Sequence, residues 1–443
     1  MVRTIDAASS FNVETMEDAP VKRSLRSFAH RFTAWQLLSL RDFRLLWLGQ
    51  SVSILGDQFY LVALPWLVLY LTGSGLTLGT VLLTAMLTRV AFQLVGGAIS
   101  DMVSQRKMMI ASSMVRAGVC LVLTVLVMSN KIHLWHLFII VAVFGMADAF
   151  FSPALKAFIP TVIDKGNLVA GNSLLSVSSL LAMFLGPSLA GLVIAIVGTG
   201  GAFAFDTASF VFVAFCLLLM KNRSSVSVPE QKTTIENAGK FPLFTSIKEG
   251  LRYTFREPTL RALITITVVV EFSFAGPFTV GLASLANTKF AGGAAAFGAM
   301  LSALGGGLLV GTLIVGATHA RHSFGKTILW LTTFLGLGLA MLGLAPNLIW
   351  ACVLMAVIGM VAGYIQVLVA SWLQTKADPQ MRGRVMSVVM LSAYALTPLS
   401  YLLTGALTQI NVSFMFIATG SLLLIMLGLC ILGSSGRALM LTR

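Results

Sequence analysis

Charged residues are scarce in this chain, and this scarcity excludes a water-soluble fold. Only 10% of the 443 residues are Asp, Glu, Lys or Arg, whereas 57% are hydrophobic and the mean hydropathy is +0.92. Soluble domains carry charges on about a quarter of their residues. The chain has too few polar side chains to cover a surface facing water, so the composition predicts an integral membrane protein.

Acidic residues are also few, with 16 Asp and Glu against 30 Lys and Arg, and the formal net charge is +14. A basic balance indicates nucleic-acid binding only where the cations form one solvated patch. Here they are dispersed between apolar segments, so we expect no nucleic-acid partner. Anionic lipids are the expected partners of these cations.

Several motifs are missing as well. The chain has no phosphate-binding Gly-Lys-Ser/Thr loop, which excludes ATP hydrolysis, and it has no enzyme constellation, so we expect neither a cofactor nor an enzyme. Residues 1–30 are polar and lack a signal-peptide core. Four of the five histidines lie in two separate pairs without further ligands, so no metal site is expected. The four cysteines have no metal or redox spacing and read as apolar filler: Cys120, Cys216, Cys352 and Cys430.

Long apolar segments are what the chain has in abundance. Each is close to the length that crosses about 30 Å of hydrocarbon. Twelve spans place both termini on one side, and nearly all Lys and Arg residues lie in the tails, the central loop and the even-numbered loops, which predicts that side to be cytoplasmic. The twelve predicted spans are 45–71, 76–100, 108–129, 133–155, 168–197, 201–220, 262–288, 293–318, 326–345, 347–374, 385–410 and 412–433.

The chain divides in its middle. Residues 221–260 are polar and separate six spans from six, and a shift of 211 positions lays Ser176 on Ser387 and Pro187 on Pro398. We therefore expect an all-α integral membrane protein with 12 transmembrane helices in two six-helix halves, both termini cytoplasmic, with a binding site between the halves. The predicted parts are a tail at 1–44, a first half at 45–220, a linker at 221–260, a second half at 261–434 and a tail at 435–443.

The loop after the second span carries a motif. Gly97, Asp101, Arg106 and Lys107 stand at the spacing of the G-x-x-x-D-[RK]-x-G-x-[RK]-[RK] motif, so the chain resembles the major facilitator superfamily. Met102 and Ser104 depart from the motif. We expect Arg106 and Lys107 to hold the loop at the anionic leaflet. The second half keeps a degenerate copy of the motif, with Gly316, Ala320, Arg321 and Lys326.

Two further elements refine the resemblance. Gly186-Pro187 in the fifth span resembles the Gly-Pro element of the superfamily's antiporters, although ordinary helix packing around a tolerated proline also explains it. The chain is similar to the branch that contains macrolide-efflux and enterobactin-exporter proteins. That similarity rests on Leu40 to Trp47, Gly56-Asp57-Gln58, Ala63 to Trp66, Phe151 to Ala154 and Arg382 to Ser387.

Asp57 lies in the middle of the first span, where a carboxylate is costly and marks a pathway by default. It shares one helix face with Gln50, Ser53 and Tyr60. Asp57 and Arg89 lie at similar depths, roughly 18–20 Å from the cytoplasmic ends of their spans at about 1.5 Å per residue, so we expect them to meet. They form either a permanent structural pair or a site where Asp57 exchanges a proton for cargo, with burial and Arg89 acting in opposite senses on its proton affinity.

Other charged residues also lie inside spans. Arg116 and Asp148 form a second possible pair, which reads as a structural brace near a gate. Asp206 is expected near the external end of the sixth span, solvated at the interface. Glu271 in the seventh span is a proton-coupling candidate equal to Asp57, on one face with Phe274 and Phe278.

The expected function is proton-coupled antiport that exports an amphipathic small molecule of drug, macrolide or siderophore type from a monomeric carrier. The alternatives are symport uptake and a receptor or assembly protein that no longer moves solute. Aromatic and amide side chains in the spans are the candidates for the cavity wall, and any one of them is equally explained by packing: Gln50, Tyr60, Phe144, Phe274, Phe278, Tyr364, Gln366 and Tyr394.

Overall fold

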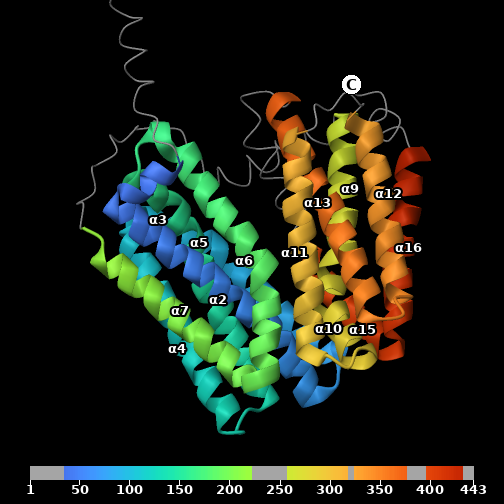
Figure 1. Cartoon of the computed structure of the whole chain (residues 1–443), viewed down its shortest axis with the longest axis horizontal. Helices are drawn as coiled ribbons and strands as arrows, with labels where there is room; N and C mark the ends of the chain where they lie inside the picture. The colour runs from blue at the N-terminus through green and yellow to red at the C-terminus, as the bar shows by residue number, and fades with distance from the viewer. Residues whose placement is uncertain (1–33, 222–256, 318–323, 377–395, 433–443) are drawn as a thin grey trace, which may run out of the picture.

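The first half of the chain forms six long helices. The computed structural model describes residues 34–221, 257–317, 324–376 and 396–432 (Figure 1). A short 3₁₀ helix, η1 (Ala34–Ser39), precedes the first span, and η2 (Lys165–Asn167) precedes the fifth. The six helices are α2 (Arg41–Thr72), α3 (Gly75–Met102), α4 (Gln105–Met128), α5 (Leu134–Val162), α6 (Leu168–Val197) and α7 (Thr199–Leu219).

The second half repeats this arrangement. Its first span is built from three consecutive pieces, because a π-helical turn, η4 (Pro277–Gly281), interrupts it between α9 (Pro258–Gly276) and α10 (Leu282–Lys289). The other helices are α11 (Gly293–Ala317), α12 (Phe324–Gly343), α13 (Leu348–Lys376), α15 (Thr397–Ile410) and α16 (Val412–Leu432). The all-helical, two-half prediction is confirmed.

The long apolar segments account for the helices. Hydrocarbon offers no hydrogen-bond partners, so the backbone N–H and C=O groups of each segment must bind one another, as they do in a helix. Within the described residues, 11 helices are long and apolar enough to cross a membrane. The twelfth predicted span, 385–410, is described only over α15, and its earlier part lies outside the described residues. Most predicted span ends lie close to the helix ends, but α5 ends at Val162 rather than at 155. In addition, α2 begins at Arg41 rather than at 45 and α9 at Pro258 rather than at 262.

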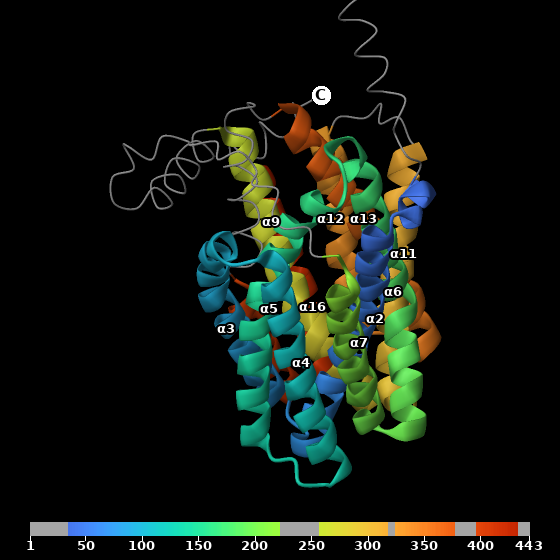
Figure 2. The same ribbon diagram turned by 90° about the vertical axis from the view of Figure 1, so that its left-hand side faces the viewer.

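The two halves are separate bundles that meet along two helix pairs. In Figure 1 the blue and green helices of the first half lie on the left, the yellow and red helices of the second half lie on the right, and the two groups converge toward the end opposite the C-terminus. Turning the molecule brings the first half to the front (Figure 2). Between the halves, α6 packs against α11 and α3 packs against α15.

The contact between α6 and α11 is made largely by backbone. Pro187 has no N–H group, so the carbonyl of Met183, four residues earlier, receives no helix hydrogen bond from it. That carbonyl faces Gly305 of α11, and the carbonyl of Pro187 faces Gly298, where an added Cβ would overlap it. The next amide, Ser188 N–H, donates to Ser302 Oγ at 2.9 Å. The Gly-Pro element therefore lies at the seam between the halves.

One basic residue near the loop after α3 binds the end of a helix. Arg106 donates through Nε to the Leu217 carbonyl at 2.8 Å and through Nη2 to the Leu218 carbonyl at 3.1 Å. A guanidinium at the carbonyl end of a helix satisfies acceptors that lack helix partners and complements the dipole. Arg106 thus binds the end of α7 and Lys107 is exposed, and the expectation that both hold the loop at the anionic leaflet stays a prediction.

Candidate functional site

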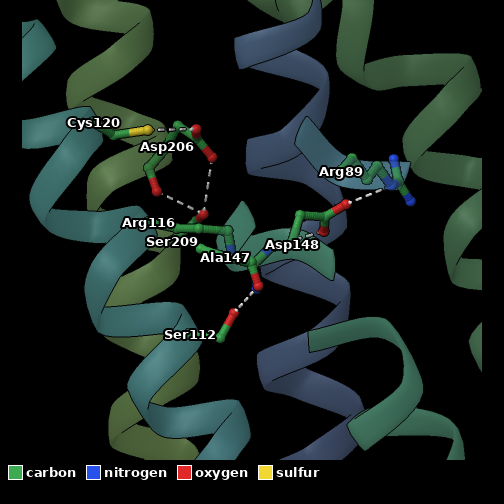
Figure 3. Close-up of polar contacts among 8 residues, drawn as sticks. All are labelled: Arg89, Ser112, Arg116, Cys120, Ala147, Asp148, Asp206 and Ser209. Carbon is green, nitrogen blue, oxygen red and sulfur yellow. Dashed lines mark hydrogen bonds and ion pairs between the residues drawn. The ribbon is translucent and has the colours of Figure 1, made fainter. Parts of the chain in front are cut away.

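A partly buried charge cluster lies at the middle of the first half, and Asp148 of α5 is at its centre (Figure 3). Its Oδ2 lies 3.1 Å from Arg89 Nε of α3, and its Oδ1 lies 3.6 Å from Arg116 Nη1 of α4. Asp148 therefore joins three helices. The contact that we expected between Arg116 and Asp148 is present.

Close backbone approaches set this geometry. Gly145 of α5 lies against the carbonyl of Ala85 in α3, where an added Cβ would come within 2.6 Å of the oxygen. Arg89 is one helical turn beyond Ala85, so it reaches Asp148 on the same side. On the other side, Ser112 Oγ of α4 donates to the carbonyl of Ala147 at 2.5 Å.

The ion pair that we expected between Asp57 and Arg89 is absent from the described structure, because Arg89 binds Asp148 instead. The positions of Asp57 and Arg89 along their spans predict a similar depth in the membrane. Depth alone does not determine which acidic side chain an arginine contacts, because that also depends on the rotation of each helix. Asp57 interacts electrostatically with Arg116, Asp148 and Arg89, but it forms no ion pair with either arginine in the described structure. Its carboxyl group is half-buried and borders a cavity.

Arg116 is almost completely buried, with 2% of its side chain exposed. The guanidinium carbon lies 4.3 Å from the ring centre of Phe151 and 4.4 Å from that of Phe210, so two aromatic faces stabilise the cation. Its Nε and Nη2 atoms have no hydrogen-bond partner in the described structure. Asp148 is thus the nearest counter-charge of a buried cation, whereas Arg89 is 48% exposed.

A cavity of about 360 Å³ opens beside this cluster. Apolar side chains and a few charged groups form its wall, as in many small-molecule sites. Tyr60 and Phe144, two of the predicted wall residues, stack there with ring centres 4.3 Å apart. The lining residues are Asp57, Tyr60, Leu61, Leu64, Leu82, Ala85, Met86, Arg89, Phe144, Gly145, Asp148 and Tyr401.

Tyr401 is the only cavity residue among these that comes from the second half, and the sequence analysis missed it. It lies on α15, near enough to interact electrostatically with both Arg89 and Glu271. A polar stripe in the sequence could have identified Tyr401 as a cavity residue. Polar side chains recur at helical spacing within this apolar span, at Thr397, Ser400, Tyr401 and Thr404.

The other predicted wall residues do not line this cavity. Gln50 is buried in the first half, Tyr364 is half-buried on α13 and Gln366 is exposed there. Phe274 of α9 and Phe278 of η4 lie on the seventh span, after Glu271 in the chain. Tyr394 lies outside the described residues, as do Arg321 and the segment Arg382 to Ser387.

The expectation that Asp206 is solvated at the interface is wrong. Asp206 is 0% exposed. Its Oδ2 accepts from the Cys120 thiol at 3.3 Å, and Ser209 Oγ lies 3.4 Å from its Oδ1 (Figure 3). Gly56, next to Asp57, permits this packing, because an added Cβ there would overlap Ser209 Oγ.

Comparison with known families agrees with this architecture. A family model described as "Transmembrane secretion effector" matches residues 32–435, which is most of the chain. The chain belongs to this family of the major facilitator superfamily. It is therefore a multi-pass transporter of the bacterial cell membrane, and not an enzyme.

Relatives of this transporter are named as efflux proteins. It is 26% identical over 364 residues to "Multidrug efflux pump Tap" of Mycolicibacterium fortuitum, covering 80% of this chain and 86% of Tap. It is 22% identical over 411 residues to "Macrolide efflux protein A" of Streptococcus pyogenes, covering 90% of this chain and 96% of that protein.

Solved structures support the fold of the transporter. A bacterial homologue of the human lysosomal transporter Spinster, in an inward-facing and unoccupied conformation, superposes with a TM-score of 0.69. The match covers 90% of this chain and 96% of that one, at 13% sequence identity.

Proposed function

We propose that this transporter exports amphipathic small molecules in exchange for protons by alternating access. The observation that carries the proposal is Asp57, a carboxyl group on the wall of a mid-span cavity, beside the Arg89–Asp148 pair and Tyr401 of the other half. A cavity shared by two halves is the place where rocking of one half against the other alternates its access. The relatives named as multidrug and macrolide efflux proteins favour export of drug-like cargo.

The Lys and Arg distribution supports a cytoplasmic position for both termini. The contacts between α6 and α11 begin in the middle of α6, where Met183 faces Gly305. They continue toward the C-terminal end of α6, where Gly191 faces Ala294. With the termini in the cytoplasm, this seam closes the external side, so the described state faces inward. A single chain supplies both walls of the cavity, which supports a monomeric carrier.

Protonation of Asp57 would couple the two substrates. With Asp57, Asp148, Arg89 and Arg116 all ionised, the cluster has no net charge, and a proton on Asp57 leaves one positive charge. Because a charge imbalance in a low-dielectric site is costly, proton binding biases the cavity toward one conformation and against a cationic cargo. A carrier that binds proton and cargo alternately performs antiport.

Substitution of Asp57 by asparagine tests the proposal. The purified transporter is reconstituted in vesicles of known orientation, and export of a fluorescent amphipathic dye is driven by an imposed pH gradient. We expect Asp57→Asn to bind the dye but to lose acceleration by the gradient, whereas Asp164→Asn, at an exposed acid before η2, behaves as wild type.

Three outcomes would contradict the proposal. Gradient-driven export that is unchanged in Asp57→Asn would remove Asp57 from coupling. Accumulation of dye in the direction of the proton flow would favour symport uptake. Absence of both binding and counterflow in the wild type would favour a receptor or assembly role.

A further inference from the structure

We propose that Glu271 is the anchor for a positively charged ammonium group on the cargo, and that Tyr401 positions that group. The inference rests on the proposed export function and adds to it a substrate class, namely amphipathic tertiary or quaternary amines. It divides the two candidate carboxyl groups between two tasks. Asp57 carries the proton, and Glu271 binds the cation.

Glu271 is a carboxyl group without a partner. It lies on α9 in the middle of the seventh span, its side chain is exposed, and no described residue forms an ion pair or hydrogen bond with it. A carboxylate at membrane depth is costly, and such residues mark ligand or ion pathways. A bound cation would supply the missing counter-charge.

Asp57 is in the opposite situation. Arg116, Asp148 and Arg89 all act on it electrostatically, and Arg89 shares the cavity wall with it. The two arginines offset the two carboxylates Asp57 and Asp148, so this cluster has no excess negative charge to hold an ammonium group. Glu271 does not itself line this cavity, and it has no basic neighbour within ion-pair distance among the described residues. The favourable position for a cation is therefore on the second-half side, beyond Tyr401.

Tyr401 connects the two sides of the cavity. It borders the same cavity as Asp57 and Arg89, and it lies within electrostatic range of both Arg89 and Glu271. Its phenol ring can face a cation, and its hydroxyl can donate to the carboxylate that holds the cation. Tyr401 thus places a cargo amine between the charge cluster and Glu271.

The backbone holds Glu271 and Tyr401 in fixed relation. Ser400, the residue before Tyr401, accepts from Gly276 N–H at 2.8 Å and donates to the Phe272 carbonyl at 2.6 Å. The Ser400 hydroxyl thus binds α9 at two points. One is Phe272, directly after Glu271, and the other is Gly276, directly before the π-helical turn η4. π-Helical turns inside longer helices are frequent at functional sites.

Aromatic side chains follow Glu271 on the seventh span, in α9 and η4. Phe274 lies one turn beyond Glu271, and its ring meets that of Phe278 edge to face, with centres 4.8 Å apart and planes at 79°. Aromatic faces attract cations through the negative face of the ring. A carboxylate on a span that also carries aromatic rings suits a bulky, weakly hydrated ammonium group better than a small inorganic cation.

Binding of two matched probes tests the inference. Both are dansyl derivatives of equal size, one ending in a trimethylammonium group and the other in the isosteric, neutral tert-butyl group. Affinities for purified full-length transporter are measured by fluorescence at one fixed pH. We expect the wild type to prefer the cation by about tenfold, and Glu271→Gln to abolish that preference while binding the neutral probe as before.

Further variants sharpen the test. Glu271→Asp, which keeps the charge, should retain part of the preference. Tyr401→Leu should lower cation affinity several-fold. Glu257→Gln, at the exposed N-cap of the same helix, should change neither affinity and serves as the matched control.

Each contrary outcome has a separate meaning. A cation preference that survives in Glu271→Gln overturns the anchor and leaves the export function standing. Loss of gradient-driven export of the neutral probe in Glu271→Gln would make Glu271 the coupling residue, which also overturns the anchor. A wild type that binds neither probe refutes both the anchor and the proposed function.

Discussion

Replacement of Asp148 by asparagine should destabilise the transporter because of what it does to Arg116. The two cations that share Asp148 differ in exposure, 2% for Arg116 and 48% for Arg89. Removal of one partner from a buried pair costs about 3–5 kcal/mol, since the other charge stays buried without compensation. An exposed pair is worth about 0–1 kcal/mol.

The expected loss for Asp148→Asn lies at the lower end of the buried range, about 3 kcal/mol, because Asp57 is close enough to compensate Arg116 in part. Arg89→Gln, which breaks only the exposed contact, should cost about 1 kcal/mol or less. The double variant Asp148→Asn with Arg116→Met should recover much of the loss, since it removes the uncompensated cation as well.

The assay is unfolding of the purified protein in mild detergent by increasing fractions of a denaturing detergent, followed by tryptophan fluorescence. Equal, small losses for Asp148→Asn and Arg89→Gln would refute the reasoning. So would a double variant less stable than Asp148→Asn, because the buried charge would then not be the source of the cost.

The remaining predictions concern close packing. Gly56→Ala should cost about 1–3 kcal/mol in the same unfolding assay, because the added methyl group overlaps Ser209 Oγ. Gly298→Ala, at the seam between the halves, should slow dye export more than it lowers stability, since its methyl group meets a backbone carbonyl of α6. Gly118→Ala, with open space around it, is the control for both and should change neither property. Ser400→Ala should cost about 1–3 kcal/mol, because the Gly276 N–H and the Phe272 carbonyl of α9 lose the hydroxyl that binds both. Wild-type stability in this last variant would show that water replaces the hydroxyl.

Much of the fold could be predicted from the sequence, because a single apolar segment in hydrocarbon can satisfy its backbone hydrogen bonds only as a helix. The span 168–197 was predicted at the same bounds that α6 has, and most other ends agree within a few residues. The π-helical turn after α9 was not predicted. Its only local sign is Gly276-Pro277, and a Gly-Pro pair is also compatible with a continuous helix, as Gly186-Pro187 shows in α6.

The charge cluster was predicted in part. The residues came from the sequence, because any charge inside a span stands out against an apolar background. Their partners depend on helix rotation and tilt, which hydropathy does not contain. Asp148 therefore meets Arg89 as well as Arg116, and Asp206, which lies only seven residues into α7, is covered by Cys120 and Ser209 rather than by water.

The seam between α6 and α11 has a consequence for the energetics of the transport cycle. Peptide carbonyls of one helix rest on glycines of the other, at Met183 with Gly305 and Pro187 with Gly298, and no described ion pair crosses between these two helices. Separation of α6 from α11 loses van der Waals attraction and a few dipole interactions between peptide groups. Dissolved ions have little effect on either interaction. The rate at which the seam opens should therefore be nearly independent of ionic strength, and it should respond instead to anything that changes the lateral pressure of the surrounding lipid.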